Sequence, residues 1–236
     1  MKNSLVRTWV FACASLLLLS GWVAAGQATT TPAIKDPKRH EGFLADIKKM
    51  NGDIDLVFVG DSITDGWRGG GKAVWQKDFA PLKALNLGIG GDRTQHVIWR
   101  LQNGELDGYK AKLFVIMIGT NNGGDSAADV AAGNEAIIKE IKAKQPQAKI
   151  LLLDIFPRGE KPNKGREKNE EVNKLLAKMD DGGKTIKYLD IGDKFLTPDK
   201  TLTKDIMPDA LHPNAKGYEI WAEAIMPSVK EMLGAK

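Results

Sequence analysis

Short apolar runs alternate with longer amphipathic stretches along most of this chain. Five of these runs are four to six residues long and rich in Val, Ile and Leu, a pattern typical of strands that are buried on both faces. The predicted strands cover residues 56–59, 84–87, 113–118, 150–155 and 186–189.

The stretches between these runs carry apolar residues at helical spacing, as where Val130 and Ile137 share one side of residues 127–144. We predict helices over residues 37–50, 94–101, 127–144 and 168–179, and a last helix after Pro213-Asn214. Strands that alternate with helices favour an α/β fold, in which helices cover both faces of a parallel sheet.

Small and polar residues directly follow the first three predicted strands. Ser62 follows the first strand, Gly90-Gly91 the second and Asn121 the third. The carboxyl ends of parallel strands meet at one edge of a sheet, and α/β proteins bind their ligands there. We therefore expect these residues to lie close together although they are far apart in the sequence.

The N-terminal segment has the pattern of a secretory signal peptide. Lys2 and Arg7 precede an apolar stretch that ends in Val23-Ala24-Ala25, which resembles a signal-peptidase site. This predicts a signal peptide over residues 1–25 and export to the periplasm or the medium. An uncleaved membrane anchor is the alternative, although a stretch of about 17 residues is short for spanning a bilayer. Residues 26–36 are predicted to be a flexible leader, and residues 37–236 a single domain.

Composition narrows the possible functions. The formal net charge is +4, and removal of residues 1–25 leaves 32 basic and 30 acidic residues. So small a bias gives no reason to expect nucleic acid as a partner, or stable membrane insertion after signal cleavage. The only cysteine, Cys13, lies in the predicted signal peptide. Cleavage therefore leaves a mature chain that has no disulfide and no thiol nucleophile. No spacing of His, Asp and Glu indicates a metal site, and we expect no cofactor.

A candidate nucleophile and a candidate base stand at opposite ends of the chain. Ser62 lies in Gly60-Asp61-Ser62-Ile63-Thr64, and Asp209 and His212 are three residues apart before Pro213. A serine hydroxyl needs an adjacent base, and the base needs an orienting group. The alternatives are a helix N-cap for Ser62 and an ordinary surface turn for Asp209. The other two histidines, His40 and His96, fall within predicted helices and are less suited to act as the base.

Two further turns supply hydrogen-bond donors. Glycines in residues 88–92 allow a backbone N–H to point into a site, and the side-chain amide of Asn121 can donate to a developing oxyanion. A dinucleotide-binding loop is excluded because position 93 is Arg and the turn follows the second strand. An ordinary tight turn is the alternative for both segments.

Four ordered blocks of the sequence resemble those of the SGNH hydrolases, also called GDSL esterases. The blocks are residues 60–65, 88–92, 119–122 and 209–213, with Ile63 in place of the name-giving leucine. From about residue 37 onward the chain also resembles the catalytic alpha subunits of intracellular platelet-activating-factor acetylhydrolase. Those subunits are cytosolic and have a regulatory partner, which we do not carry over to a chain with an export signal.

The resemblance implies a three-layer flavodoxin-like fold with a five-stranded parallel sheet in the order 2-1-3-4-5. It implies that Ser62 is the nucleophile, that His212 is the base and that Asp209 orients it. The implied oxyanion hole consists of the backbone N–H groups of Ser62 and Gly91 and the Asn121 side chain. The positions that close the acyl pocket in the acetylhydrolases are here Ile63, Thr120 and Leu211, which are large enough to favour acetyl or other short acyl groups.

These observations predict an exported serine esterase that removes short acyl groups from a small-molecule, glycan or lipid ester. A lysophospholipase or thioesterase with a longer acyl preference is one alternative. A non-catalytic carbohydrate-binding protein on a hydrolase fold is another, and a nucleotide-binding flavodoxin-like protein is disfavoured because the chain lacks a phosphate loop. Since the related acetylhydrolase subunits dimerise, a homodimer is a further expectation.

Overall fold

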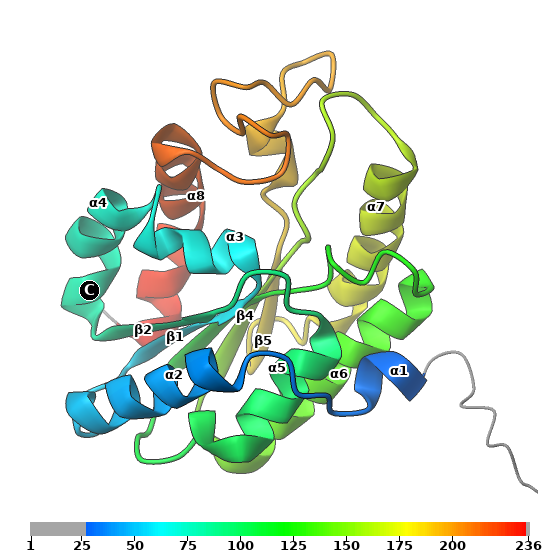
Figure 1. Ribbon diagram of the computed structural model, residues 1–236. Helices are drawn as coiled ribbons and strands as arrows, with labels where there is room; N and C mark the ends of the chain where they lie inside the picture. The colour runs from blue at the N-terminus through cyan, green and yellow to red at the C-terminus, as the bar shows by residue number, and fades with distance from the viewer. Residues whose placement is uncertain (1–26, 235–236) are drawn as a thin grey trace, which may run out of the picture.

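The sheet has five parallel strands in the order β2-β1-β3-β4-β5 (Figure 1), as the resemblance implies. The computed structural model describes residues 27–234. The strands are β1 (Leu56–Gly60), β2 (Ala84–Gly88), β3 (Leu113–Met117), β4 (Lys149–Leu153) and β5 (Ile186–Leu189). Each lies within about two residues of its predicted position, because each is a short apolar run with a clear beginning and end.

Helices cover both faces of this sheet. The α-helices of the described chain are α1 (Gln27–Thr30), α2 (Pro37–Met50), α3 (Ser62–Asp65), α4 (Lys72–Val74), α5 (Thr94–Arg100), α6 (Ala127–Lys144), α7 (Lys164–Leu176) and α8 (Ala215–Leu233). Short π-helical segments, Trp75–Phe79 and Leu101–Glu105, continue α4 and α5. Single 3₁₀ turns cover Gly66–Arg68, Ala80–Leu82, Ala177–Met179 and Gly192–Phe195.

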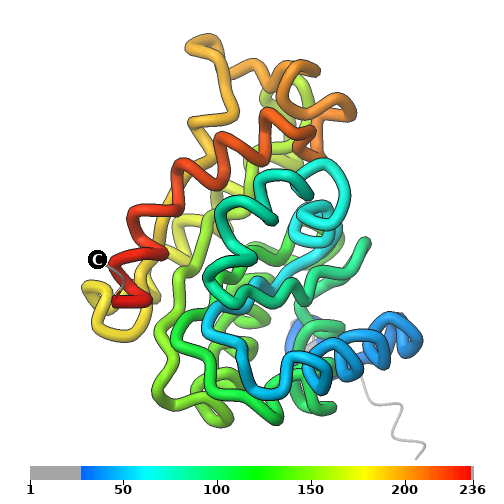
Figure 2. The backbone as a smooth tube through the Cα atoms, turned by 90° about the vertical axis from the view of Figure 1, so that its left-hand side faces the viewer, coloured from blue at the N-terminus to red at the C-terminus, as the bar shows by residue number. Residues whose placement is uncertain are grey.

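Alternating side chains of the strands separate two hydrophobic cores. Val57 and Val59 of β1 pack in one core with residues of α2, α5, α6 and α7. Leu56 and Phe58 point the other way and pack with residues of α4 and α8. Figure 2 shows α2 in blue and α8 in red on opposite sides of the strands. The result is the predicted three-layer architecture, with both faces of the sheet removed from water.

Helix α7 begins four residues before its predicted start. The sequence predicts a helix from residue 168, but the side chain of Asn163 accepts hydrogen bonds from the N–H groups of Gly165 and Arg166. This N-cap starts the helix at Lys164, within a segment whose high charge hides the helical pattern.

Residues 27–36, predicted as a flexible leader, instead hold a helix and long-range contacts. Thr29 in α1 is fully buried, and its hydroxyl donates to the carbonyl of Asp129 in α6. The hydroxyl of Thr94 in turn donates to the carbonyl of Thr29. This segment therefore belongs to the folded domain, because tertiary hydrogen bonds order a stretch whose composition alone favours a loop.

The predicted signal peptide, residues 1–25, lies outside the described residues. Within residues 27–234, none of the helices combines the length and the apolar character needed to cross a membrane.

Candidate active site

Ser62 is the first residue of α3, directly after β1. The capping residue is Asp61, whose side chain accepts a hydrogen bond of 3.0 Å from the N–H of Ile63. Ser62 is therefore not the N-cap, which was the alternative for this position. Its hydroxyl lies at the carboxyl edge of the sheet, and its own N–H belongs to the first helical turn and has no intrahelical acceptor.

Asp209 and His212 lie in a strained turn before α8. Ala210 has a φ of 57°, a left-handed conformation that an alanine rarely adopts. Two hydrogen bonds hold it there, from its own N–H to Met207 O at 2.9 Å and from Gly159 N–H to its carbonyl at 2.8 Å. The turn folds Asp209 back, so that one carboxylate oxygen accepts from the N–H groups of Leu211 and His212.

The side chains of Asp209, His212 and Ser62 form a continuous hydrogen-bonded series. The second oxygen of Asp209 lies 2.6 Å from His212 Nδ1, and His212 Nε2 lies 2.8 Å from Ser62 Oγ. Ser62 and His212 are 150 positions apart in the chain. With Asp209 accepting at Nδ1–H, the free Nε2 of a neutral imidazole can take the hydroxyl proton of Ser62.

The other two described histidines have different partners. His40 is buried, and its Nδ1 lies 2.9 Å from the carboxylate of Glu105. His96 Nδ1 accepts from the N–H of Arg93, and burial together with nearby cations lowers the pKa of His96 to about 4. Both observations agree with the expectation that neither acts as the base toward Ser62.

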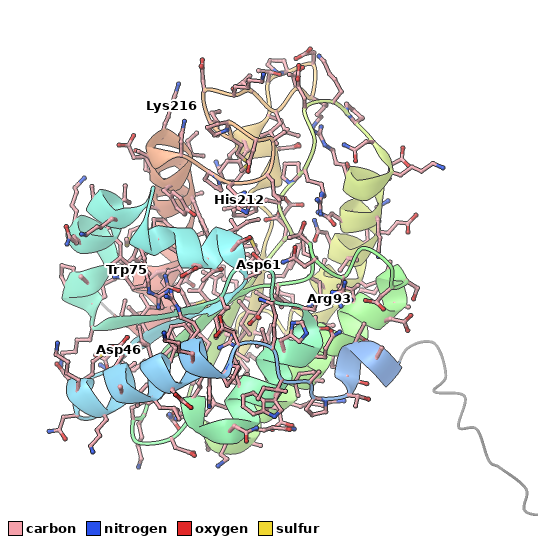
Figure 3. The ribbon with its side chains drawn as sticks, viewed as in Figure 1. Asp46, Asp61, Trp75, Arg93, His212 and Lys216 are labelled. Carbon is pink, nitrogen blue, oxygen red and sulfur yellow. The ribbon has the colours of Figure 1, made fainter. Side chains whose placement is uncertain are left out.

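The two carboxyl groups near His212 have opposite electrostatic environments. Burial raises the pKa of Asp209, but hydrogen bonds from His212 and Leu211 outweigh this effect and bring it below its ordinary value. Burial and the charge of Asp92 raise the pKa of Asp61 to about 7, against the hydrogen bond from Ile63. Figure 3 shows Asp61 and His212 near one another above the strands. Asp209 therefore carries the permanent negative charge at this site.

Three candidate donors lie at the same edge of the sheet, the N–H groups of Ser62 and Gly91 and the side-chain amide of Asn121. Gly91 has a φ of 74° in a turn closed by a hydrogen bond from Asp92 N–H to Ile89 O, a conformation that favours glycine. Across residues 27–234, no acceptor is found for the Gly91 N–H. Asn121 donates from Nδ2 to the carbonyl of Asp92 at 2.9 Å, which leaves its second amide hydrogen available.

Buried polar side chains brace these donors. Asn122 Oδ1 accepts from Thr94 N–H at 3.1 Å, and Asn122 Nδ2 donates to Asp125 at 2.9 Å, so this side chain holds the turn. Asp92 is buried and accepts from Arg100 Nε at 3.0 Å. The sequence reasoning did not single out Arg100, since a charged residue in a helix gives no signal that it is buried.

The three predicted pocket residues differ in their placement. Ile63 is 1% exposed and packs in the core beside α8, so its side chain offers almost no surface to a substrate. Leu211 is half-buried against the same core. Thr120 lines a cavity of about 540 Å³ next to Asn121, and its carbonyl and hydroxyl accept from Arg158 Nη1. Arg158 was not among the predicted site residues.

Comparison with known proteins identifies the family of this chain. The model of the GDSL-like lipase/acylhydrolase family matches residues 58–220. The chain belongs to this family. The alpha2 subunit of platelet-activating factor acetylhydrolase IB from Rattus norvegicus is 44% identical over 180 residues, which cover 76% of this chain and 77% of the relative. The alpha1 subunit from Homo sapiens is 41% identical over 179 residues, 76% of each chain.

Two solved structures share the fold at lower identity. An acetylxylan esterase from Geobacillus stearothermophilus has a TM-score of 0.59 and 19% identity, and the match covers 80% of this chain and 97% of the esterase. A carbohydrate acetylesterase from Sinorhizobium meliloti has a TM-score of 0.57 and 17% identity, with 76% and 99% covered. As a GDSL-like acylhydrolase, the protein is a carboxylic ester hydrolase.

Proposed function

We propose that this GDSL hydrolase is an exported serine esterase that removes acetyl and other short acyl groups through Ser62, His212 and Asp209. The observation that carries the proposal is the series of short contacts from Asp209 to His212 and from His212 to Ser62. A serine, a histidine and a carboxylate in this arrangement have the roles of nucleophile, base and orienting group.

In this mechanism Ser62 Oγ attacks the ester carbonyl while His212 Nε2 takes its proton. The alkoxide then leaves with that proton, and an acyl group stays on Ser62. Water, deprotonated by the same histidine, attacks the acyl group and releases the acid. The ionised Asp209 stabilises the imidazolium that forms in each half of the reaction.

The N–H groups of Ser62 and Gly91 and the side-chain amide of Asn121 would bind the oxyanion that develops on the carbonyl oxygen. Loss of one such donor typically costs about 3–4 kcal/mol of transition-state stabilisation. The open N–H of Gly91 and the second amide hydrogen of Asn121 support this role.

The acetyl preference rests on relatives and fold neighbours. The relatives at 41–44% identity are named acetylhydrolase subunits, and the two fold neighbours are an acetylxylan esterase and a carbohydrate acetylesterase. Export rests on the pattern of residues 1–25. Together they favour an acetylated molecule outside the cytoplasm as the substrate.

The test is hydrolysis of 4-nitrophenyl acetate, butyrate and octanoate by residues 26–236, beside the Ser62→Ala variant. We expect acetate to be hydrolysed fastest and the variant to lose on the order of 10³-fold or more in kcat. Both proteins are also treated with a fluorophosphonate, and their masses are measured. A wild type that gains one covalent adduct, beside a Ser62→Ala variant that gains none, would identify Ser62 as the nucleophile. Octanoate preference would contradict the short-acyl proposal, and equal rates for both proteins would contradict the role of Ser62.

A further inference from the structure

A basic cavity adjoins the candidate active site. It has a volume of about 540 Å³ and lies between the loop that follows β3 and the first half of α7. Its lining includes Thr120, Gly123, Arg158, Lys164 and Lys168. None of the residues that line it is an aspartate or a glutamate.

The cationic side chains of this cavity, those of Arg158, Lys164 and Lys168, form no ion pair with a carboxylate of residues 27–234. Lys168 Nζ donates to the carbonyls of Asn122 and Gly123 at 2.7 and 3.0 Å. Arg158 donates from Nη1 to the carbonyl and the hydroxyl of Thr120. A guanidinium carries five N–H donors, so Arg158 keeps several for a ligand.

The cavity is coupled to the candidate active site on two sides. Thr120, which contributes to its wall, directly precedes Asn121. Gly159, which follows Arg158, donates its N–H to the carbonyl of Ala210 in the turn between Asp209 and His212. The cavity therefore borders the loop that carries Asn121, and the residue after Arg158 contacts the turn that carries His212.

We propose that this cavity is a subsite for a carboxylate or phosphate group on the alcohol part of the ester. The inference rests on the proposed esterase function and names its substrate class, acetyl esters of acidic alcohols such as a uronic acid or a phosphorylated sugar. Three cations around one cavity with no lining carboxylate bind an anion through charge-assisted hydrogen bonds, and Arg158 can bind a planar carboxylate or a phosphate with two donors.

Lys164 is the residue to change, because it lines the cavity and is exposed, whereas Arg158 and Lys168 also hold loop carbonyls. The matched control is Lys174, an exposed lysine in the last turn of the same helix that is not part of the lining. The variants Lys164→Glu and Lys174→Glu change the net charge equally and differ in their place on α7.

The substrates are monoacetylated glucose, glucuronic acid and glucose 6-phosphate. We expect Lys164→Glu to lower kcat/KM about threefold to tenfold on the two acidic esters and to leave acetyl-glucose within twofold, while Lys174→Glu changes none of them. A carboxylate subsite gives the larger loss on glucuronate, and a phosphate subsite the larger loss on the phosphorylated sugar. Equal rates of Lys164→Glu and wild type on both acidic esters would overturn the proposal.

A binding measurement separates this inference from the proposed function. Calorimetric titration of Ser62→Ala and of Ser62→Ala with Lys164→Glu, using free glucuronate and inorganic phosphate, requires no catalysis. Binding to the first protein that weakens at least threefold in the second supports the subsite even if no ester is hydrolysed. Absence of binding to Ser62→Ala, or equal binding to both proteins, would overturn the subsite while leaving the esterase proposal intact.

Discussion

Two aspartates near His212 show how the surroundings of a side chain decide its chemistry. Asp209 is 57% exposed and accepts three hydrogen bonds, which keep it ionised. Asp61 is 1% exposed, and its pKa of about 7 leaves a large neutral fraction near neutral pH. A histidine that becomes an imidazolium needs a charged acceptor at its second nitrogen. Asp209 meets this need and Asp61 serves as the cap of α3.

Gly60 is the residue that lets α3 pack tightly onto the end of β1. A Cβ at this position would overlap the hydroxyl of Thr64 and lie 2.5 Å from the carbonyl of Met117, both parts of rigid elements. The bend that aims Ser62 into the site therefore requires a glycine directly before Asp61.

We expect Gly60→Ala to lower the free energy of unfolding by about 1–3 kcal/mol or more, because the core must expand. Gly42→Ala in α2 is the control, since a Cβ there meets nothing within 4 Å and the change favours the helix by about 0.5–1 kcal/mol. Urea unfolding of the three proteins measures both effects. A Gly60→Ala protein as stable as wild type would contradict the close packing.

Helix ends position much of the site. Asp61 caps α3, Asn163 caps α7 and Asn214 caps α8, each through a side-chain oxygen that accepts backbone N–H groups. Ser62, the basic cavity and the turn of Asp209 and His212 each border one of these helix starts. The caps therefore set both where these helices begin and how the adjoining loops leave them.

Asn163 links the start of α7 to the loop of Arg158. Its oxygen caps Gly165 and Arg166, and its amide donates to the carbonyl of Arg158 at 2.9 Å. We expect Asn163→Ala to cost about 1 kcal/mol of stability, while Asn163→Asp keeps the cap and costs less. Thermal unfolding of both variants tests the difference. Equal losses would show that the amide, not the cap, is the stabilising group.

The whole molecule brings together segments that are far apart in the chain. Parallel strands in the order β2-β1-β3-β4-β5 place the ends of β1, β2 and β3 side by side. The long connection between β5 and α8 returns toward the same edge of the sheet (Figure 1). Within it, Nε2 of His212 lies 2.8 Å from Ser62 Oγ. Burial of polar groups in this arrangement raises the pKa values of three carboxyl groups, those of Asp61, Asp92 and Asp154.

Stability should fall as the pH rises from about 4 to 9. Burial raises the pKa to about 7 for Asp61 and about 8 for Asp154, above the ordinary value of 3.8. The charge of Asp92 adds to this effect at Asp61, and the charge of Asp190 adds to it at Asp154. The folded state therefore binds these protons more tightly, so their contribution is full below pH 3.8 and is lost as the pH passes 7 to 8.

Asp154→Asn keeps an acceptor for the N–H of Ile191, which lies 2.9 Å from Asp154 Oδ1. We expect its stability relative to wild type to rise by about 2–4 kcal/mol between pH 4 and pH 9. Urea unfolding at both pH values provides the measurement. A pH-independent difference between the two proteins would mean that Asp154 does not titrate in this range.

Much of this protein follows from local sequence. The five apolar runs determined the strands, and the spacing in residues 37–50 and 127–144 gave helices with those bounds. The polar residues after the first three strands indicated one shared edge. These features are local, because strand burial and helix faces depend on the period of apolar residues within a short window.

The tertiary structure decided what depends on contacts between distant segments. It placed His212 against Ser62, ordered α1 through Thr29, buried the side chain of Ile63 in the core and formed the cavity that Thr120 and Lys164 line. No local pattern carries this information, since serine, threonine and lysine also occur on solvent-exposed surfaces in the same local sequence. Burial, electrostatic environment and the meeting of two loops arise only when the sheet and its helices pack together.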